Sequence, residues 1–152
     1  ILYNHESPLR PTTFVTRKIT RAAAMIGAGL QQTLQLGNVE VRRDWGWAPD
    51  YVDCMLRMAQ HGEPDDFVVA TGTSHSILEF AEAAFVAAGV ADWRDRIEVD
   101  PNLVRPADSA DLVGDATKAR TLLGWQPTKT FPEIVAAMVA ADMTDTGVEP
   151  AQ

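Results

Sequence analysis

The residues of this sequence that could do chemistry are mainly cations placed where an anionic ligand could reach them. Arg42 and Arg43 follow a short predicted strand and turn, and Arg105 lies in a loop after another predicted strand. The planar guanidinium group suits two-point contacts with phosphate. Lys18 follows Val15 by three positions in a predicted helix, which inclines its side chain toward the buried side of that helix. These residues predict a site for a phosphate-bearing, sugar-like ligand.

Polar residues also follow the apolar start of the chain. This start reads as a strand that ends in Asn4, His5 and Glu6, as strands of α/β proteins do when they deliver side chains to a site. Adjacent residues of a strand point to opposite faces, which argues against His5 and Glu6 acting as an acid–base pair. Gly37, next to Asn38, would let the backbone approach a ligand closely.

Each of these features also has a purely structural interpretation. Arg42 and Arg43 could equally be solvated loop charges that pair with Asp44. A single Arg-Pro loop is more often structural than functional. His61 and His75 fall in turn-like segments, which predicts surface positions for both. The tryptophans at positions 45 and 47 are more typical of a packed domain junction than of base stacking.

Composition is that of an ordinary globular protein of one domain. The chain has 152 residues, of which 46% are apolar and 22% are charged. No apolar run approaches the roughly 18 residues of a membrane span, and there is no signal-like start. Cys54 falls on a helical apolar pattern, which predicts a buried, inert thiol. One cysteine and three scattered histidines offer no metal cluster, and they favour the cytoplasm as the compartment.

The net charge of −8 is unevenly distributed. Residues 1–61 hold 7 Lys and Arg against 5 Asp and Glu, whereas residues 62–152 hold 6 against 16. The acidic total argues against a nucleic-acid partner, which would require a basic face. The local basic excess in the first part is compatible with a small anionic ligand there.

Hydrophobic periodicity predicts alternating strands and helices in the first third of the chain. A helix is expected over residues 14–28, with Arg17 and Arg21 on a different face from its apolar stripe. Residues 33–36 read as a short strand. Residues 42–47 read as a dense polar and aromatic loop.

The same reading continues through the middle of the chain. A helix begins near Pro49 and buries four apolar residues: Val52, Met55, Leu56 and Ala59. Residues 67–72 form a continuous apolar run, consistent with a buried parallel strand. Ser76 and Glu79 make a capping-box pattern that opens a helix stopped by Gly89.

The last third has one strand and two helices. Residues 97–99 read as a strand, and Asp115 caps a short helix that ends at Gly124. Thr130 opens the last helix, beyond which residues 144–152 are expected to form a flexible tail. Residues 1–143 then make up one α/β unit.

Two expected strands, residues 1–4 and 67–71, have no obvious partner in this sequence. Unpaired ladder groups are costly, which predicts that another part of the protein supplies the rest of the sheet. The fold class is therefore α/β, with a partial Rossmann-like parallel sheet and a small α/β substrate-binding domain. The chain reads as the second half of a larger enzyme.

Seven stretches of the sequence occur in the same order in the GDP-mannose 4,6-dehydratases of the extended short-chain dehydrogenase/reductase family, which the chain resembles from residue 1 to about residue 140. They are NHESP at 4–8, FVTRKI at 14–19, LGN at 36–38, RDWG at 43–46, DYV at 50–52, ATG at 70–72 and LGW at 123–125. The combination of NHESP, TRKI and RDWG is specific to this family.

This resemblance implies an NADP-dependent lyase that converts GDP-mannose into GDP-4-dehydro-6-deoxy-mannose. Such enzymes oxidise C4 of the mannose transiently, lose water across C5–C6 and return the hydride at C6. It implies NADP contacts at His5 and Arg10. It also implies GDP-sugar contacts at nine positions: Asn4, Val15, Lys18, Leu36, Gly37, Asn38, Arg43, Arg105 and Asp108.

The sequence departs from the family pattern in two respects. The glycine-rich dinucleotide loop and the catalytic residues of the family precede NHESP, so this chain is expected to be inactive alone. The family stretch Arg-Pro-Thr-Glu-Val-Asp reads RPADSA at 105–110, so that Asp108 replaces a glutamate. Two alternatives therefore stay open: a non-catalytic interaction module, and part of another nucleotide-sugar reductase or epimerase. An exposed sheet edge favours a homo-oligomer, either a dimer or a tetramer.

Overall fold

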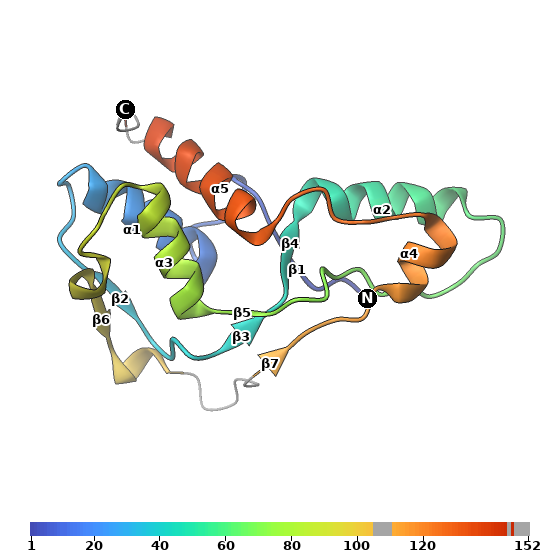
Figure 1. Cartoon of the computed structure of the whole chain (residues 1–152), viewed down its shortest axis with the longest axis horizontal. Coiled ribbons are helices and arrows are strands. Elements are labelled where there is room, and N and C mark those ends of the chain that lie inside the picture. The colour runs from blue at the N-terminus through green and yellow to red at the C-terminus, as the bar shows by residue number, and fades with distance from the viewer. Residues whose placement is uncertain (105–110, 146, 148–152) are drawn as a thin grey trace.

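The computed structural model describes residues 1–104, 111–145 and 147, and its helices gather at the two ends of an elongated shape (Figure 1). The five α-helices are α1 (Val15–Gly27), α2 (Ala48–Gln60), α3 (Ile77–Ala87), α4 (Thr117–Leu123) and α5 (Phe131–Asp145). Two short 3₁₀ helices are η1 (Trp93–Arg96) and η2 (Pro101–Leu103). The strands are β1 (Asn4–Glu6), β2 (Leu34–Leu36), β3 (Arg42–Arg43), β4 (Trp45–Trp47), β5 (His75–Ser76), β6 (Ile97–Val99) and β7 (Asp111–Leu112).

The strands form three small sheets in which parallel pairing dominates. β1 pairs with β4 and β2 pairs with β6, both in parallel. β3 is the centre of the third sheet, antiparallel to β5 and parallel to β7. Parallel pairs joined by helical connections confirm the predicted α/β class.

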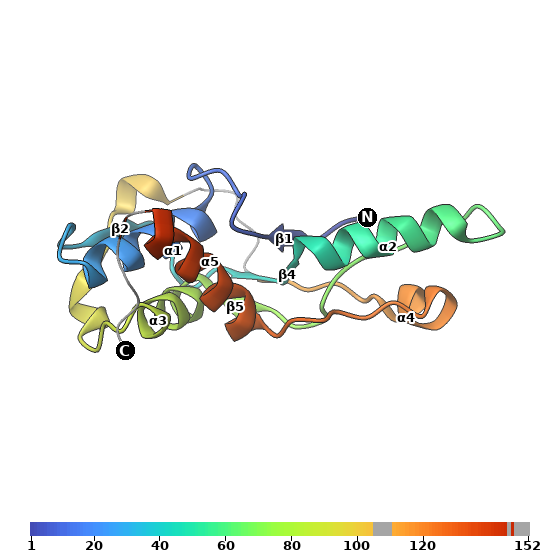
Figure 2. The ribbon, with the colours of Figure 1, turned by 90° about the horizontal axis from the view of Figure 1, so that it is seen from above.

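One end of the molecule, which we call the three-helix lobe, consists of α1, α3 and α5 with β2 and β6. Each of its three helices contacts the other two (Figure 2). The apolar faces of these helices form one continuous core. The predicted capping box of α3 is present, because the Ser76 hydroxyl accepts from the Glu79 N–H and the Glu79 carboxylate accepts from the Ser76 N–H. The bounds predicted for α1 and α3 are confirmed within one or two residues.

The opposite end, which we call the two-helix lobe, consists of α2, α4 and the chain segments 1–3 and 67–70. Its separate core is built around Tyr51, Cys54 and Trp125. Cys54 is buried as predicted, and burial raises the pKa of its thiol. Figure 2 shows α2 and α4 extending away from the three-helix lobe.

Residues 42–47 are two short strands, not the predicted loop. Arg42 and Arg43 form β3 between β5 and β7, and residues 45–47 form β4 beside β1. Two residues are too few to show an apolar alternation, and the partners of β3 are also only two residues long. A strand this short is specified by its neighbours and carries no period of its own.

The two strands predicted to lack partners in this chain pair with each other. Leu2 and Val69 form a parallel bridge, and the Tyr3 N–H donates to the Val69 carbonyl at 3.0 Å. The pairing involves only a few residues, so residues 67–72 do not form a regular strand. Val69 and Ala70 are fully buried, as the apolar run predicted.

Helix α1 reverses the predicted placement of its two neighbouring cations. Arg17 is buried, because its guanidinium pairs with Asp142 of α5 at 2.9 Å, whereas Lys18 is exposed. Helix α1 packs against both α3 and α5, so its buried face is wider than a single apolar stripe. The expectations that Arg17 lies on a polar face and that Lys18 leans toward the buried side are therefore wrong.

Helix α2 buries the opposite face from the predicted one. Val52, Met55 and Leu56 are 40–59% exposed, whereas Asp50 and Tyr51 are buried. Polar anchors select this face: the buried Trp125 indole donates to the Asp50 carbonyl, and the Asp50 carboxylate accepts from the backbone N–H and hydroxyl of Thr128. An apolar stripe alone does not reveal such anchors.

The remaining boundaries agree with the sequence pattern. β6 coincides with the expected strand, Asp115 accepts from the Thr117 N–H at the start of α4, and Gly124 ends that helix in the left-handed conformation. Helix α5 extends to Asp145, and the division at residue 143 stays a prediction. Within the described residues, no helix is both long and apolar enough to cross a membrane.

Candidate functional site

The polar residues of β1 lie at the junction between the two lobes. Asn4 and His5 pair with Trp45 and Gly46 of β4, which is separated from Arg43 by Asp44 alone. His5 Nδ1 lies 2.9 Å from the Tyr3 carbonyl oxygen, and its ring stacks on Tyr51 of α2 at 4.9 Å between centroids. A side chain on Gly46 would collide with the Tyr51 ring, so this glycine is required for the stacking.

Glu6 was not among the predicted contacts, yet it is the most buried charged group of this segment. Its carboxylate is fully buried and accepts from the Thr16 hydroxyl at 2.7 Å. Arg10 Nε lies 3.5 Å from the same carboxylate oxygen, and the Arg10 guanidinium lies 3.8 Å above the Phe14 ring. Burial raises the pKa of Glu6, against the opposing effects of the Thr16 hydroxyl and of the Arg10 and His5 side chains.

Lys18 reaches from α1 to β2, although its side chain is exposed. Lys18 Nζ donates to the Gln35 carbonyl at 2.6 Å. It lines a cavity of about 480 Å³ together with Arg21 and several uncharged polar residues. Val15, at the start of α1, is half-buried against the core that contains Leu36. The structure therefore brings Lys18 beside β2, which is followed in the chain by the predicted contacts Gly37 and Asn38.

The turn after β2 is shaped by contacts within the chain. A Cβ atom on Gly37 would lie 2.5 Å from the Leu103 carbonyl oxygen, so the close approach at this glycine is made by Leu103. The Asn38 carboxamide oxygen accepts from the Glu40 N–H at 3.0 Å. The predicted role of Gly37 thus has a structural explanation in the described residues, and its role toward a ligand stays a prediction.

Arg42 and Arg43 are both held by the surrounding chain, but neither is held by Asp44. Arg42 donates to the Ser74 carbonyl at 2.8 Å and pairs with Glu79 at 3.2 Å. Arg43 Nη1 donates to the Arg42 carbonyl at 2.7 Å. Both arginines stay half-buried. Arg105 and Asp108, the other predicted contacts, lie outside the described residues.

Asp44 instead joins two distant segments of the chain to its own at the centre of the molecule. It is fully buried, and its carboxylate accepts from the Thr71 and Gly72 N–H groups at 2.9 Å and from the Gly114 N–H at 3.2 Å. The Thr71 hydroxyl also donates to it at 2.6 Å. No sequence pattern marks these partners, because they lie 27 to 70 residues away.

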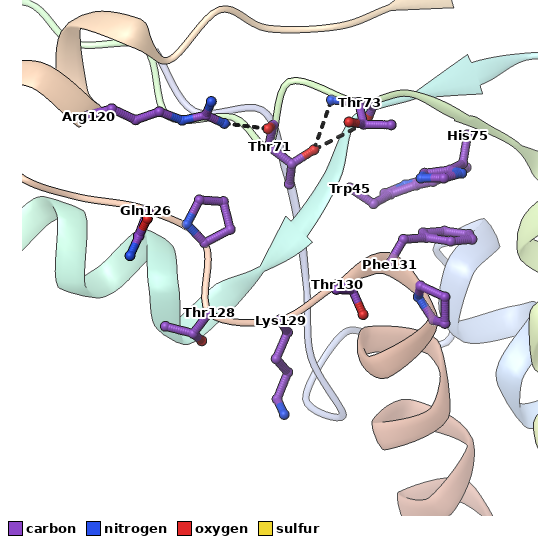
Figure 3. A pocket seen from close by; sticks show the side chains of 12 residues that line it. Trp45, Thr71, Thr73, His75, Arg120, Gln126, Thr128, Lys129, Thr130 and Phe131 are labelled. Carbon is purple, nitrogen blue, oxygen red and sulfur yellow. Dashed lines mark hydrogen bonds between the residues drawn. The ribbon is translucent and has the colours of Figure 1, made fainter.

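A second cavity, of about 560 Å³, opens between the lobes and contains none of the predicted residues (Figure 3). His75 and Phe131 stack along one side of it at 3.8 Å, with Trp45 behind them, and Arg120 reaches in to donate to the Thr71 carbonyl. Burial lowers the pKa of His75. His75 is thus half-buried, which contradicts its predicted surface position, whereas Trp45 packs at a junction as expected.

The overall fold matches solved enzymes of the short-chain dehydrogenase/reductase type. The structure titled as RMD from Pseudomonas aeruginosa, complexed with NADPH, superposes with a TM-score of 0.86 and 26% identity, covering 95% of this chain and 47% of that one. The dTDP-glucose 4,6-dehydratase of Bacillus anthracis superposes with a TM-score of 0.77 at 16% identity, which supports the fold alone. The fold is therefore Rossmann-like α/β, as predicted.

Sequence comparison narrows this class to one family. A family model described as GDP-mannose 4,6 dehydratase matches residues 1–138, so the chain belongs to that family. GDP-mannose 4,6 dehydratase 1 of Arabidopsis thaliana is 49% identical over 143 residues, covering 94% of this chain and 39% of that protein. The human GDP-mannose 4,6 dehydratase is 43% identical over 159 residues. The chain thus spans less than half the length of these curated relatives.

Proposed function

We propose that this chain is the GDP-sugar-binding portion of a GDP-mannose 4,6-dehydratase. The complete enzyme would convert GDP-mannose into GDP-4-dehydro-6-deoxy-mannose with loss of water. The observation that carries this proposal is the family match over residues 1–138. The substrate contacts would be those implied by the family resemblance: Asn4, Val15, Lys18, Leu36, Gly37, Asn38, Arg43, Arg105 and Asp108.

The geometry of Lys18 and Arg43 supports binding of a diphosphate. Lys18 Nζ is exposed yet donates to the Gln35 carbonyl, so a cation lies beside β2 without an acidic partner among the residues that the structure describes. Arg43 ends β3 immediately before the buried Asp44, which fixes the backbone that carries it. Two cations on rigid elements suit a ligand with two phosphate groups.

His5 and Arg10 would hold NADP, which when bound would supply reversible hydride transfer. The residues present fit an anionic cofactor, because the Arg10 side chain is a cation with 21% of its surface exposed. His5 is fixed by stacking on Tyr51. These two side chains would bind and orient the cofactor, and the catalytic groups would come from the portion of the enzyme that this chain does not span.

The proposed assembly is a homo-oligomer, either a dimer or a tetramer, in the cytoplasm. The partly exposed apolar residues of α2 support association with further protein surface. A chain with a single buried cysteine suits a reducing compartment.

The test is GDP-mannose binding by this chain, alone and joined to the remaining portion of the Arabidopsis relative. We expect micromolar binding and turnover by the joined protein and no turnover by the chain alone. Lys18→Ala should weaken binding about tenfold through loss of a phosphate contact. Lys118→Ala is the matched control, since Lys118 is also exposed and makes a 2.6 Å contact, but to Asp65 in the other lobe. Equal loss in both variants would contradict the proposed site.

A further inference from the structure

Glu6 is a carboxylate buried where β1 meets the start of α1. Its Oε2 accepts from the hydroxyl of Thr16, the second residue of α1. Helix α1 has no side-chain cap at Phe14 and no acidic residue in its first turn. Glu6 therefore supplies from β1 the negative charge that favours a helix N-terminus.

Arg10 places its inner edge toward this carboxylate. Its Nε lies 3.5 Å from Glu6 Oε2, and its guanidinium carbon lies 3.8 Å above the Phe14 ring. The guanidinium group is rigid and planar, so a fixed Nε edge and a fixed face together set the direction of the two terminal nitrogens. The Arg10 side chain keeps 21% of its surface exposed, while Glu6 keeps 1%.

Two buried atoms of this pair lack hydrogen bonds within the described residues. They are Glu6 Oε1 and Arg10 Nε. A buried polar atom without a partner costs on the order of 1–3 kcal/mol, so a purely structural ion pair would be expected to close.

We propose that Glu6 is a positioning residue, whose carboxylate lies 3.5 Å from the inner edge of Arg10 and orients the guanidinium group by charge attraction, so that the terminal nitrogens face a phosphate group of a bound dinucleotide. This inference rests on the proposed function, because it takes Arg10 as a cofactor contact. Phosphate bound at the outer edge draws on the same rigid group that Glu6 holds at the inner edge. Because Glu6 and the Phe14 ring already orient the guanidinium group, less side-chain freedom is lost when the phosphate binds.

The first test uses this chain alone and follows the side-chain Nε–H signal of Arg10 by nuclear magnetic resonance. Glu6→Gln should shift this signal, because the substitution removes the negative charge that lies 3.5 Å from Nε. Thr16→Val is the control, since it removes the hydroxyl contact but keeps the Glu6 charge, and it should leave the signal near its original position. An Arg10 signal that ignores Glu6→Gln would overturn the proposed coupling.

The second test measures binding of NADP⁺ and of GDP-mannose by the joined protein. Glu6→Gln should weaken NADP⁺ binding about tenfold, leave GDP-mannose binding within about twofold, and not lower the thermal midpoint. Arg10→Lys keeps the cation but lacks Nε, and should cause the same loss. The double variant should lose no more than either single variant.

The outcomes separate the positioning role from the proposed function. Unchanged NADP⁺ affinity in Glu6→Gln, or equal loss for both ligands together with a lowered thermal midpoint, would reject a positioning role. Failure of the unsubstituted joined protein to bind GDP-mannose would instead reject the proposed function. The Arg10 signal in the chain alone would still report on the coupling between Glu6 and Arg10.

Discussion

The two lobes of this molecule are built from similar elements but bury them to different extents. In the three-helix lobe, α1, α3 and α5 each contact the other two, and their apolar residues are largely covered. In the two-helix lobe, the face of α2 that carries Asp50 and Tyr51 is buried, while Val52 and Leu56 remain more than half exposed. One lobe closes its own core, whereas the other presents an apolar helix face to its surroundings.

This difference shows which lobe is stabilised mainly by contacts within this chain. The three-helix lobe also contains a buried ion pair whose partners come from the two ends of the chain, Arg17 and Asp142. Such pairs require their surroundings to be complete, since an unpaired buried charge is costly. The two-helix lobe depends instead on Asp50 and Trp125, which join α2 to the segment after α4. We therefore expect substitutions in the two lobes to have unequal effects.

The largest effect is expected at Asp142. Asp142→Ala leaves the buried Arg17 guanidinium without its main partner and removes the acceptor of the Thr20 hydroxyl. The free energy of unfolding should fall by about 3–5 kcal/mol, measured by urea denaturation. Asp145→Ala is the matched control, because Asp145 also pairs with Arg17 but at 3.5 Å and with 64% of its side chain exposed. It should cost less than about 1 kcal/mol, and equal costs would contradict the distinction.

The next effect compares apolar truncations in the two lobes. Met138→Ala removes a fully buried side chain from α5 and should cost about 2–5 kcal/mol. Leu56→Ala removes a side chain that is 59% exposed on α2, and its cost should stay within about 0.5 kcal/mol. Urea denaturation of both variants measures the difference. A cost at Leu56 close to that at Met138 would show that the α2 face is covered in solution, which sedimentation would then detect as self-association.

The smallest effect concerns the cavity between the lobes and depends on pH. Burial lowers the pKa of His75, so the folded chain disfavours the protonated imidazole relative to the unfolded chain. The stability contributed by neutral His75 is present above its ordinary pKa of 6.5 and is lost as the pH falls through the lowered value. His75→Gln should therefore lose less stability than the unsubstituted chain on acidification from about pH 7 to 5. Urea denaturation at both pH values measures this difference. An equal loss of unfolding free energy in the variant and in the unsubstituted chain would contradict this expectation.

Local signals in the sequence predicted the elements whose specification is local. The Ser76 and Glu79 capping box fixed the start of α3, and Gly124 fixed the end of α4. The continuous apolar run predicted the burial of Val69. Each of these features depends on residues only a few positions apart, so periodicity and capping rules could identify them.

Features set by distant partners could not be predicted in this way. Arg17 and Lys18 exchange their expected environments because Asp142 lies 125 residues further along the chain. Helix α2 turns its apolar stripe outward because Asp50 and Trp125 anchor the other face. At the candidate site, the family resemblance supplied the residues, but the burial of Glu6 and the cavity beside His75 required coordinates.

The buried Asp44 has a consequence for the order in which the molecule assembles. Its carboxylate is satisfied only when Thr71, Gly72 and Gly114 have all arrived, across separations of 27 to 70 residues. Closing such loops before their contacts form is slow, because chain entropy opposes it. We therefore expect the hydrogen-bond network around Asp44 to form after the helices. This late step would fix the position of the two lobes relative to each other.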